Sequence, residues 1–495
     1  MSTDEGIFST AIRKPLQIES LDVASISGVP DADMDLIRLL AKVWRQKYPN
    51  NLLRSSYYYA HEKLNDFGIG VPQSIRSQVK ACVGWPHKAV RSLADFTDFD
   101  GWEYQGGDTY GIDELSEESG LRLAIQPAVI SCYMHSCSFL TVVSDDEGIM
   151  VVPRSADWSA ALWNGARNRL KAVLTIKDAD SNGYITAFDV FLPGRTWQIR
   201  RDGFSMQWRV AYMQETPQWP GPCAVAFVND QQLSRPLGVS RISRPVMALT
   251  DMAFRSMVRM ETTAEFYAAP KLWFLGADKG AFSKGTWDSL ISAINGLGRD
   301  VKGDLPQIVQ IQQASMQPHS DMLKTIAMMC ASEMSVPVDE MGITLDNPSS
   351  AEAMAAAERK LTRIADRQNK AFGMQLKRLM QMAICLRDNI SHDSMPDGLK
   401  RITSWFAPTR EITDAARADT YAKIAGVNPA YATSTVAYRR LGLTADEINI
   451  LKAEQSVDEL RTKLLNASAQ EATDGAQTTK QEEQPSAGQS QSEAA

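Results

Sequence analysis

The sequence predicts an α+β protein, because helical patterns lie on both sides of a block of short β-type segments. Between residues 138 and 229, short apolar runs alternate with turns, which is typical of a meander of hairpins. On either side, apolar residues recur every three or four positions, which predicts amphipathic helices. With 495 residues, of which 44% are hydrophobic and 22% charged, the chain is long enough for several domains.

Charge and cysteine content exclude some classes of protein. The 52 Lys and Arg residues against 59 Asp and Glu give a formal charge of -7, which disfavours tight DNA binding but suits the passage of DNA without adhesion. No apolar run approaches the roughly 18 to 20 residues of a membrane span, and the N-terminus lacks an export signal, so we expect a soluble protein. The 6 cysteines form no CxxC pair, and we expect them to be reduced.

The first 135 residues are predicted to be mainly helical. A helix begins at Asp31 or Asp33, and further helices are expected over 74–83, 85–93 and 112–125. The strands that follow are predicted at FLTVV, GIMVVP, LKAVLTI, YITAFDVFLP, RTWQIR, MQWRVAYM and CAVAFV.

A second helical block begins near residue 243, where Pro245 fits the first turn of a helix that continues to about residue 268. A compact β-α-β unit follows, with strands at KLWFLG and QIVQIQ and a helix over 286–294. Another helix is predicted over 318–335. Methionines mark many apolar positions of these helices, which predicts core packing or, alternatively, subunit contacts that repack.

The longest predicted helix runs from Ser349 to about Arg387, roughly 60 Å at 1.5 Å per residue. Its start is sharply specified. Pro348 disfavours helix at Asn347, Ser349 can cap the helix, and Glu352 completes the spacing of a capping box.

Three modest helices are predicted near the C-terminus, over 412–425, 429–441 and 444–465. Thr444 and Glu447 have capping-box spacing. Residues 466–495 are rich in Gln, Ser, Ala and Glu, and we expect them to be disordered because they cannot bury enough apolar surface.

The segment from Asp178 to Asp189 matches most of the pattern of an EF-hand calcium loop. However, its flanks look like strands, and Asn182-Gly183 between β-type runs is a strong hairpin signal. We interpret the segment as a turn, and calcium binding is the alternative.

Enzymatic signatures are weak. His61 begins a pattern similar to HExxH, but Asn65 stands where the second histidine belongs. No phosphate loop, GxGxxG or GxSxG occurs. Carboxylate patches at 95–100 and 113–118 are interpreted as solvated turns and helix starts. We expect no catalytic residues, metal or cofactor, and a carboxylate-dependent nuclease is the enzymatic alternative.

Several separated segments resemble the Gp6-like branch of the portal proteins of tailed bacteriophages. These segments are 83–102, 227–242, 238–278 and 345–361, and the resemblance covers about residues 35 to 460. It implies a wing over 1–242, a stem helix over 243–268, a clip over 269–317, a second stem helix over 318–335, a tunnel loop over 336–348, a long wing helix with its linker over 349–404, and a crown over 405–465.

The resemblance also implies a function. Such proteins form a homo-oligomeric ring, usually of twelve copies, at one capsid vertex. Double-stranded DNA passes through without sequence specificity, driven by a terminase. The implied partners are terminase, the major capsid protein or scaffold, and head-tail connector proteins. The implied location is the virion, with the host cytoplasm during assembly. Another ring-forming head or connector protein is the structural alternative.

The predicted tunnel loop is apolar and acidic, with no Lys or Arg between Val336 and Asn347, so we expect it to touch DNA without holding it. Its predicted DNA-facing residues are Val338, Asp339, Glu340, Met341, Ile343, Thr344, Leu345 and Asp346. The predicted loop–helix junction is Asn347, Pro348, Ser349 and Glu352. The predicted partner-binding residues of the clip are Trp273, Phe274 and Trp287.

Overall fold

The structure is a computed structural model, and it describes residues 14–61, 82–104, 109–203, 206–267, 272–275, 307–310, 315–342, 351–410, 413–458 and 460–463. The helix predicted over 74–83 lies outside these residues except for its last two positions, which are not helical, and the helix predicted over 286–294 and the tail from 466 lie outside them entirely. The chain forms two compact units, one comprising 1–97 and 110–400 and the other 98–109 and 401–495. Among the described residues, no helix is long and apolar enough to span a membrane.

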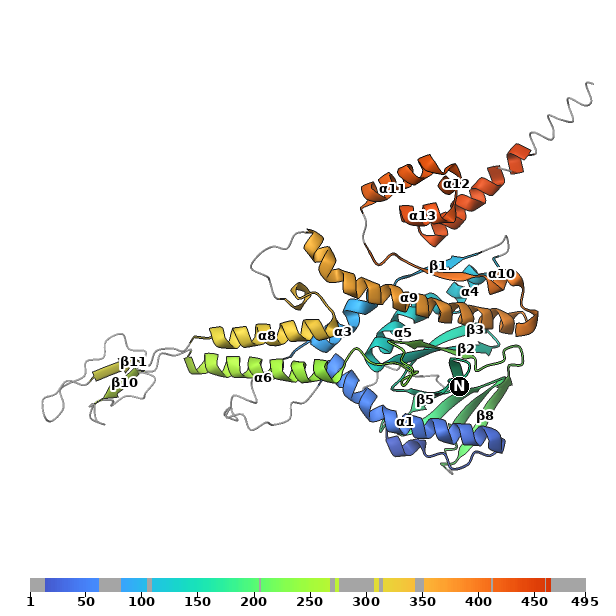
Figure 1. The fold of residues 1–495 in the computed structure, drawn as a ribbon. Helices are drawn as coiled ribbons and strands as arrows, with labels where there is room; N and C mark the ends of the chain where they lie inside the picture. The colour runs from blue at the N-terminus through green and yellow to red at the C-terminus, as the bar shows by residue number, and fades with distance from the viewer. Residues whose placement is uncertain are drawn as a thin grey trace, which may run out of the picture. The chain divides into compact units, whose positions relative to one another are not determined.

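Two antiparallel sheets form most of the β part of the first unit (Figure 1). The five-stranded sheet has the order β4-β5-β6-β7-β8: Ser159–Asn164, Arg169–Ala179, Ile185–Leu192, Arg195–Arg201 and Trp208–Glu215. The three-stranded sheet has the order β3-β2-β9: Gly148–Ser155, Cys137–Asp145 and Ala224–Val228. The seven predicted runs are confirmed as strands. Strand β4 was not predicted, because its short run is rich in alanine, which has little β preference.

Helices of the first unit precede and follow these sheets. Their bounds are η1 Ile18–Leu21, α1 Asp31–Tyr58, α3 Trp85–Ala94, α4 Ile112–Glu118, α5 Leu121–His135, α6 Arg244–Tyr267, α8 Gln317–Met334, η3 Asp339–Met341, α9 Ala351–Arg387, η4 His392–Ser394 and α10 Asp397–Lys400. A short antiparallel pair, β10 Leu272–Leu275 with β11 Gln307–Gln310, lies between α6 and α8 in the sequence.

Two details of the predicted helices are wrong. The single helix predicted over 112–125 is two helices, because Gly120 adopts a left-handed φ of 71° that interrupts the helix. Neither aspartate caps α1: Pro30 is the N-cap residue without a side-chain bond. Asp31 and Asp33 instead lie in the first turn, where their charge favours the positive end of the helix dipole.

The main core of the first unit lies between α1 and the five-stranded sheet. Trp44 of α1 and Phe188 and Ile199 of the sheet are almost fully buried there. The indole N–H of Trp44 donates to the carbonyl of Asp157 at 2.9 Å, and the indole of Trp197 donates to the carboxylate of Asp33 at 3.0 Å. Both buried indoles therefore have partners, as burial of a polar group requires.

The long helix α9 has 37 residues and is about 55 Å long. The predicted apolar face is confirmed, since Leu361, Ala365, Phe372, Leu376 and Leu379 are all buried. Two polar side chains add to this packing. Asn369 accepts from the hydroxyl of Thr97 at 2.8 Å and donates to the carbonyl of Phe96 at 2.9 Å, and Gln368 donates to Asn229 at 3.0 Å.

The second unit joins two distant parts of the chain. Strand β1, Phe99–Glu103, pairs antiparallel with β12, Thr403–Phe406, and Arg439 forms an ion pair with Glu103. Residues 98–109 were predicted to belong to the wing segment, and the sequence contains no signal for this pairing.

Helices complete the second unit: α11 Asp414–Val427, α12 Pro429–Ala432, α13 Thr435–Leu441 and a further helix from residue 445. The helix predicted over 429–441 is divided, because Ser434 accepts a hydrogen bond from the backbone N–H of Ala437 and starts a new helix. The predicted capping box is confirmed. The N–H of Thr444 donates to the Glu447 carboxylate at 2.8 Å, and the N–H of Glu447 donates to the Thr444 hydroxyl at 3.3 Å.

Candidate functional site

Helices α6 and α8 lie side by side and share one apolar seam (Figure 1). Val246, Leu249 and Ala253 of α6 are buried against Ile326 and Cys330 of α8. The two helices predicted over 243–268 and 318–335 are thus confirmed as helices, and the seam holds them as a pair.

The start of α3 packs on the end of this seam, where Val83, Ala89, Met334 and Val336 share the same cluster. Arg241, just before α6, stabilises this junction through hydrogen bonds to three other helices. Its guanidinium donates to the carbonyl of Ala89 in α3 and, at 2.7 Å, to the carbonyl of Met334 at the end of α8. Its backbone N–H donates to the carbonyl of Tyr133 in α5 at 2.9 Å.

Burial lowers the pKa of Arg241 to about 10, so the side chain stays charged at neutral pH and donates to both carbonyls. The sequence analysis missed this residue. In the sequence, Arg241 is marked only by its position directly before a predicted helix, and many arginines without a role in a site share such a position.

The chain after α8 folds back on the seam. Met341, in the short turn η3, packs against the cluster shared by α6, α8 and α3. The Glu340 carboxylate lies 3.1 Å from the ammonium of Lys88 in α3, whereas Asp339 is exposed. The described start of the predicted tunnel loop therefore has one exposed acidic side chain, one acidic side chain paired with a cation of the same chain, and one apolar anchor.

The other predicted site residues are placed only in part. Residues Ile343 to Ser349 lie outside the described residues, and so does the side chain of Glu352, which belongs to α9. Trp273 and Phe274 lie in β10, paired with Val309 and Ile308 of β11. Trp287 lies outside the described residues. The structure therefore describes neither the complete loop nor all three aromatic residues.

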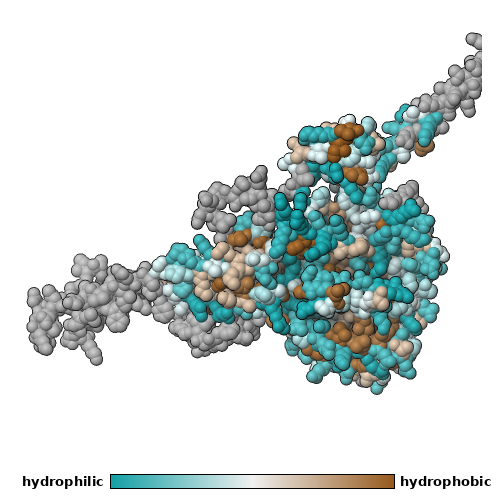
Figure 2. Space-filling view, viewed as in Figure 1, coloured by the Kyte–Doolittle hydropathy of each residue, from teal (hydrophilic) through white to brown (hydrophobic). Residues whose placement is uncertain are grey.

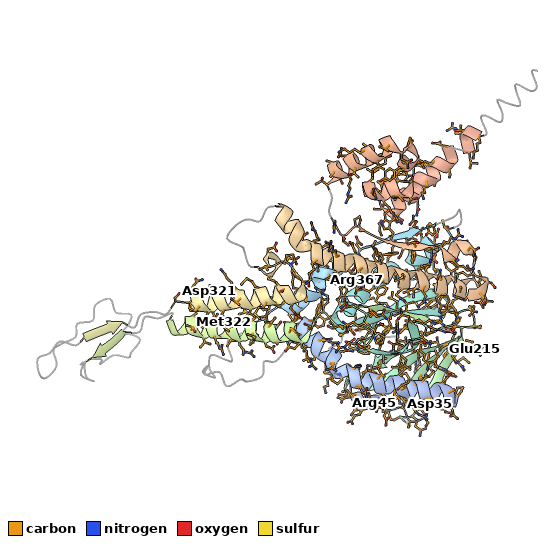
Figure 3. The ribbon with its side chains drawn as sticks, in the orientation of Figure 1. Asp35, Arg45, Glu215, Asp321, Met322 and Arg367 are labelled. Carbon is orange, nitrogen blue, oxygen red and sulfur yellow. The ribbon has the colours of Figure 1, made fainter. Side chains whose placement is uncertain are left out.

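Methionines line the outside of the α6–α8 pair. Met252, Met322, Met328 and Met329 are between 37% and 54% exposed, although each belongs to a helix with a buried seam. Figure 2 shows apolar surface over this helix pair, and Figure 3 labels Met322 on α8 next to Asp321. We refer to these four side chains as the methionine surface. In one copy of the chain it faces solvent, and flexible thioethers suit contacts that repack.

The calcium-like segment is a hairpin turn between β5 and β6, as predicted. Asp180 accepts from the backbone N–H groups of Asn182 and Tyr184 at 2.9 and 2.8 Å, and Gly183 adopts a φ of 86°. Asp189 is buried in β6 beside Arg154 at 3.9 Å, away from the turn. Among the described residues, no group of three potential metal ligands was found.

A buried polar cluster surrounds His135 at the end of α5. Its Nε2 lies 2.9 Å from the hydroxyl of Ser55, and its Nδ1 lies 3.4 Å from the hydroxyl of Ser155, which donates to Asp157. These residue types are those of a serine hydrolase, but the aspartate accepts from a serine instead of orienting the imidazole. His135 is only 3% exposed, so we interpret the cluster as core packing.

The family model described as "Phage portal protein, SPP1 Gp6-like" matches residues 40–432. The chain belongs to this family of phage portal proteins.

Two curated portal proteins of mycobacterial phages are similar to this portal protein over most of its length. The portal protein of Mycobacterium phage D29 is 28% identical over 405 residues, covering 76% of this chain and 79% of the relative. That of Mycobacterium phage L5 is 28% identical over 399 residues, covering 75% of this chain and 78% of the relative.

Solved structures of phage-like particles are more distantly similar. A chain of the virion of a native gene transfer agent particle has 14% identity and a TM-score of 0.42, covering 79% of this chain and 99% of that one. A chain of the neck of the native particle, computed with C12 symmetry, has 12% identity and a TM-score of 0.40, covering 76% and 95%.

Proposed function

We propose that this portal protein forms a ring at one capsid vertex, the channel for double-stranded DNA during packaging and ejection. The family match over residues 40–432 carries this proposal. The methionine surface supports it, because a closed ring requires each copy to present apolar surface to its neighbours. The family is structural, and the proposed role is mechanical, without catalysis.

The parts of the ring follow the order of the elements. We assign α6 and α8 to the stem that lines the channel, and residues 336–348 to the tunnel loop that faces DNA. The segment 269–317 with β10 and β11 is the clip, α9 belongs to the wing, and residues 405–465 form the crown. The copy number expected of this family is twelve.

The start of the tunnel loop suits contact without adhesion. Asp339 is exposed and repels phosphate, while Lys88 is held by Glu340 and so adds little free positive charge nearby. Met341 anchors the loop start to the stem seam. We infer that the loop guides DNA with little friction, and that its movement is transmitted through the stem and α9.

The proposed partners follow from the position of the ring. The clip, including Trp273, Phe274 and Trp287, is proposed to meet the terminase during packaging and connector proteins afterwards. The wing is proposed to meet the major capsid protein or scaffold. Assembly takes place in the host cytoplasm, and the finished ring belongs to the virion.

Electron microscopy of the purified full-length protein tests the proposal most directly. We expect closed rings with a central channel, and the symmetry gives the copy number. A protein that stays monomeric at high concentration, or that forms rings unable to recruit terminase, contradicts the portal role.

Charge reversal tests the loop. We expect Asp339→Lys to slow DNA packaging and impair retention, because an exposed cation attracts the phosphate backbone. Asp393→Lys, an exposed change in η4, is the matched control. Unaltered packaging and retention with Asp339→Lys, relative to this control, would falsify the guiding role of the loop.

A further inference from the structure

Seven cationic side chains occupy one face of α9. Successive residues of an α-helix are rotated by about 100°, which places all seven within an arc of about 100°. Asp366, at the edge of this arc, is the single acidic residue between positions 359 and 378. We call these residues the α9 stripe: Arg359, Lys360, Arg363, Arg367, Lys370, Lys377 and Arg378.

The stripe faces outward, opposite the buried apolar face of the helix. Its first five cations are exposed, and four of them line a shallow groove together with Ile364. Arg367, labelled in Figure 3, approaches Asp230 only to 4.0 Å, and both side chains are more than half exposed. Such an exposed pair contributes little, so among the described residues it compensates little of the positive charge of the stripe.

The far end of the stripe reaches a second arginine from the sheet. Arg378 and Arg169 line one hollow together with Trp163 and Trp219. Burial lowers the pKa of Arg378, and the like charge of Arg169 lowers it further. Within the described ranges, neither guanidinium forms an ion pair with a carboxylate. Two neighbouring cations without a counter-charge favour an anionic ligand.

We propose that the α9 stripe binds the phosphate backbone of double-stranded DNA at a site separate from the tunnel loop. The stripe spans about 28 Å, and its cations follow one another at steps of about 6 Å over the first three turns, which suits a regular array of phosphates. Such contacts carry no sequence information, as a protein of the packaging machinery requires. The proposal rests on the proposed portal function for its biological setting and on charge geometry for its chemistry.

A protein partner fits the stripe less well. Seven long cationic side chains lose their hydration in a protein–protein interface, and each then needs a paired carboxylate. Lysine is depleted in the cores of such interfaces whereas arginine is enriched, so the three lysines of the stripe disfavour a protein partner and its four arginines do not. A phosphate backbone leaves both partners partly solvated and gains affinity from released counterions.

The test measures binding of a fluorescein-labelled duplex of about 30 base pairs to the full-length protein by anisotropy, over a series of salt concentrations. The stripe variant carries Arg359→Gln, Arg363→Gln and Lys370→Gln. The control carries Lys42→Gln, Lys47→Gln and Arg209→Gln, three exposed cations outside α9. We expect the stripe variant to lose at least about tenfold in affinity at 0.1 M salt, and its salt slope to fall by about 3. The control should keep the wild-type slope.

A second variant separates charge from geometry. Arg359→Lys with Arg363→Lys keeps the charge, so DNA affinity should be retained, whereas a bidentate contact with protein carboxylates would be lost. The proposal is overturned by equal losses in stripe and control variants, by no loss, or by loss in the lysine variant. It is also overturned if the stripe variant binds DNA normally but no longer forms rings, since the stripe then contacts a second copy. Ring formation by the wild type, seen by microscopy, tests the portal function independently.

Discussion

The sheet body and the stem of this portal protein differ in how completely each satisfies itself within one chain. In the body, α1 covers the five-stranded sheet, and Trp44, Phe188 and Ile199 are enclosed on all sides. In the stem, α6 and α8 share a narrow seam, and the methionine surface remains open. The body therefore buries these three side chains within one chain, whereas the α6–α8 pair leaves four methionines exposed, which the proposed ring would cover.

Polar anchors compensate for the narrow seam where the stem meets the body. Arg241 joins α3, α5 and α8 through backbone carbonyls. The hydroxyl of Tyr57 in α1 donates to the carboxylate of Asp251 in α6 at 3.0 Å. The position of the α6–α8 pair therefore depends on a few directional hydrogen bonds as well as on its apolar seam.

The largest expected effect is the loss of stability when one buried isoleucine is truncated in each of the two cores. Ile199→Ala in the sheet should lower the free energy of unfolding by about 4 kcal/mol, and Ile326→Ala in the stem by about 2 kcal/mol, because the narrower seam collapses more easily onto the cavity. Urea unfolding of both variants measures the difference. Equal losses would show that the stem is as self-contained as the body.

Removal of the Arg241 anchor should have the next largest effect. Arg241→Met leaves the carbonyls of Ala89 and Met334 without their donor, at a cost of about 2 to 3 kcal/mol. We expect faster hydrogen exchange in α8, with protection in the sheet unchanged. Arg209→Met, an exposed change, is the control. Equal hydrogen-exchange rates in α8 for the two variants would show that Arg241 does not stabilise the attachment of α8.

The methionine surface should matter for assembly more than for stability. Met328→Gln with Met329→Gln should change the free energy of unfolding by no more than about 0.5 kcal/mol, because both side chains already face solvent. The same change should raise the protein concentration at which rings form, measured by mass photometry. Met150→Gln with Met206→Gln, exposed methionines outside the stem, should leave assembly unchanged.

The last expected effect is a pH dependence of stability confined to the body. Burial lowers the pKa of His135, with Arg54 acting in the same direction and Asp157 opposing it. Below the ordinary histidine pKa of about 6.5, the unfolded chain binds a proton that the folded chain excludes, so stability falls as the pH falls.

The loss is at most about 1.4 kcal/mol per pH unit for one proton. Thermal unfolding of wild type and His135→Gln between pH 7 and 5 should show a shallower slope for the variant. Identical slopes would mean that protonation of His135 does not destabilise the body.

Patterns within short segments were predictable because neighbouring residues decide them. The apolar face of α9, the capping box at Thr444 and the turn at Asn182-Gly183 each depend on residues only a few positions apart. The break at Gly120 was missed, since isolated glycines are often tolerated within helices and the residues around it continue a helical pattern.

Contacts between distant residues were not predictable from the sequence. Strands β1 and β12 are three hundred positions apart, and the Thr403–Phe406 partner has no pattern that points to Phe99–Glu103. The two acidic residues of the loop start look equivalent in sequence, yet within the described part of the chain it is Glu340 that pairs with a cation, Lys88.

Most helices and hairpins and the portal family follow from the sequence, because periodicity, turn chemistry and family resemblance depend on residues close together in the chain. The pairing of side chains became known only from the three-dimensional structure: Arg241 with three helices, Glu340 with Lys88, and Arg378 beside Arg169 without a carboxylate among the described residues. The physical reason is that charge and hydrogen bonding act over a few ångströms in space, and separation along the chain does not fix that distance.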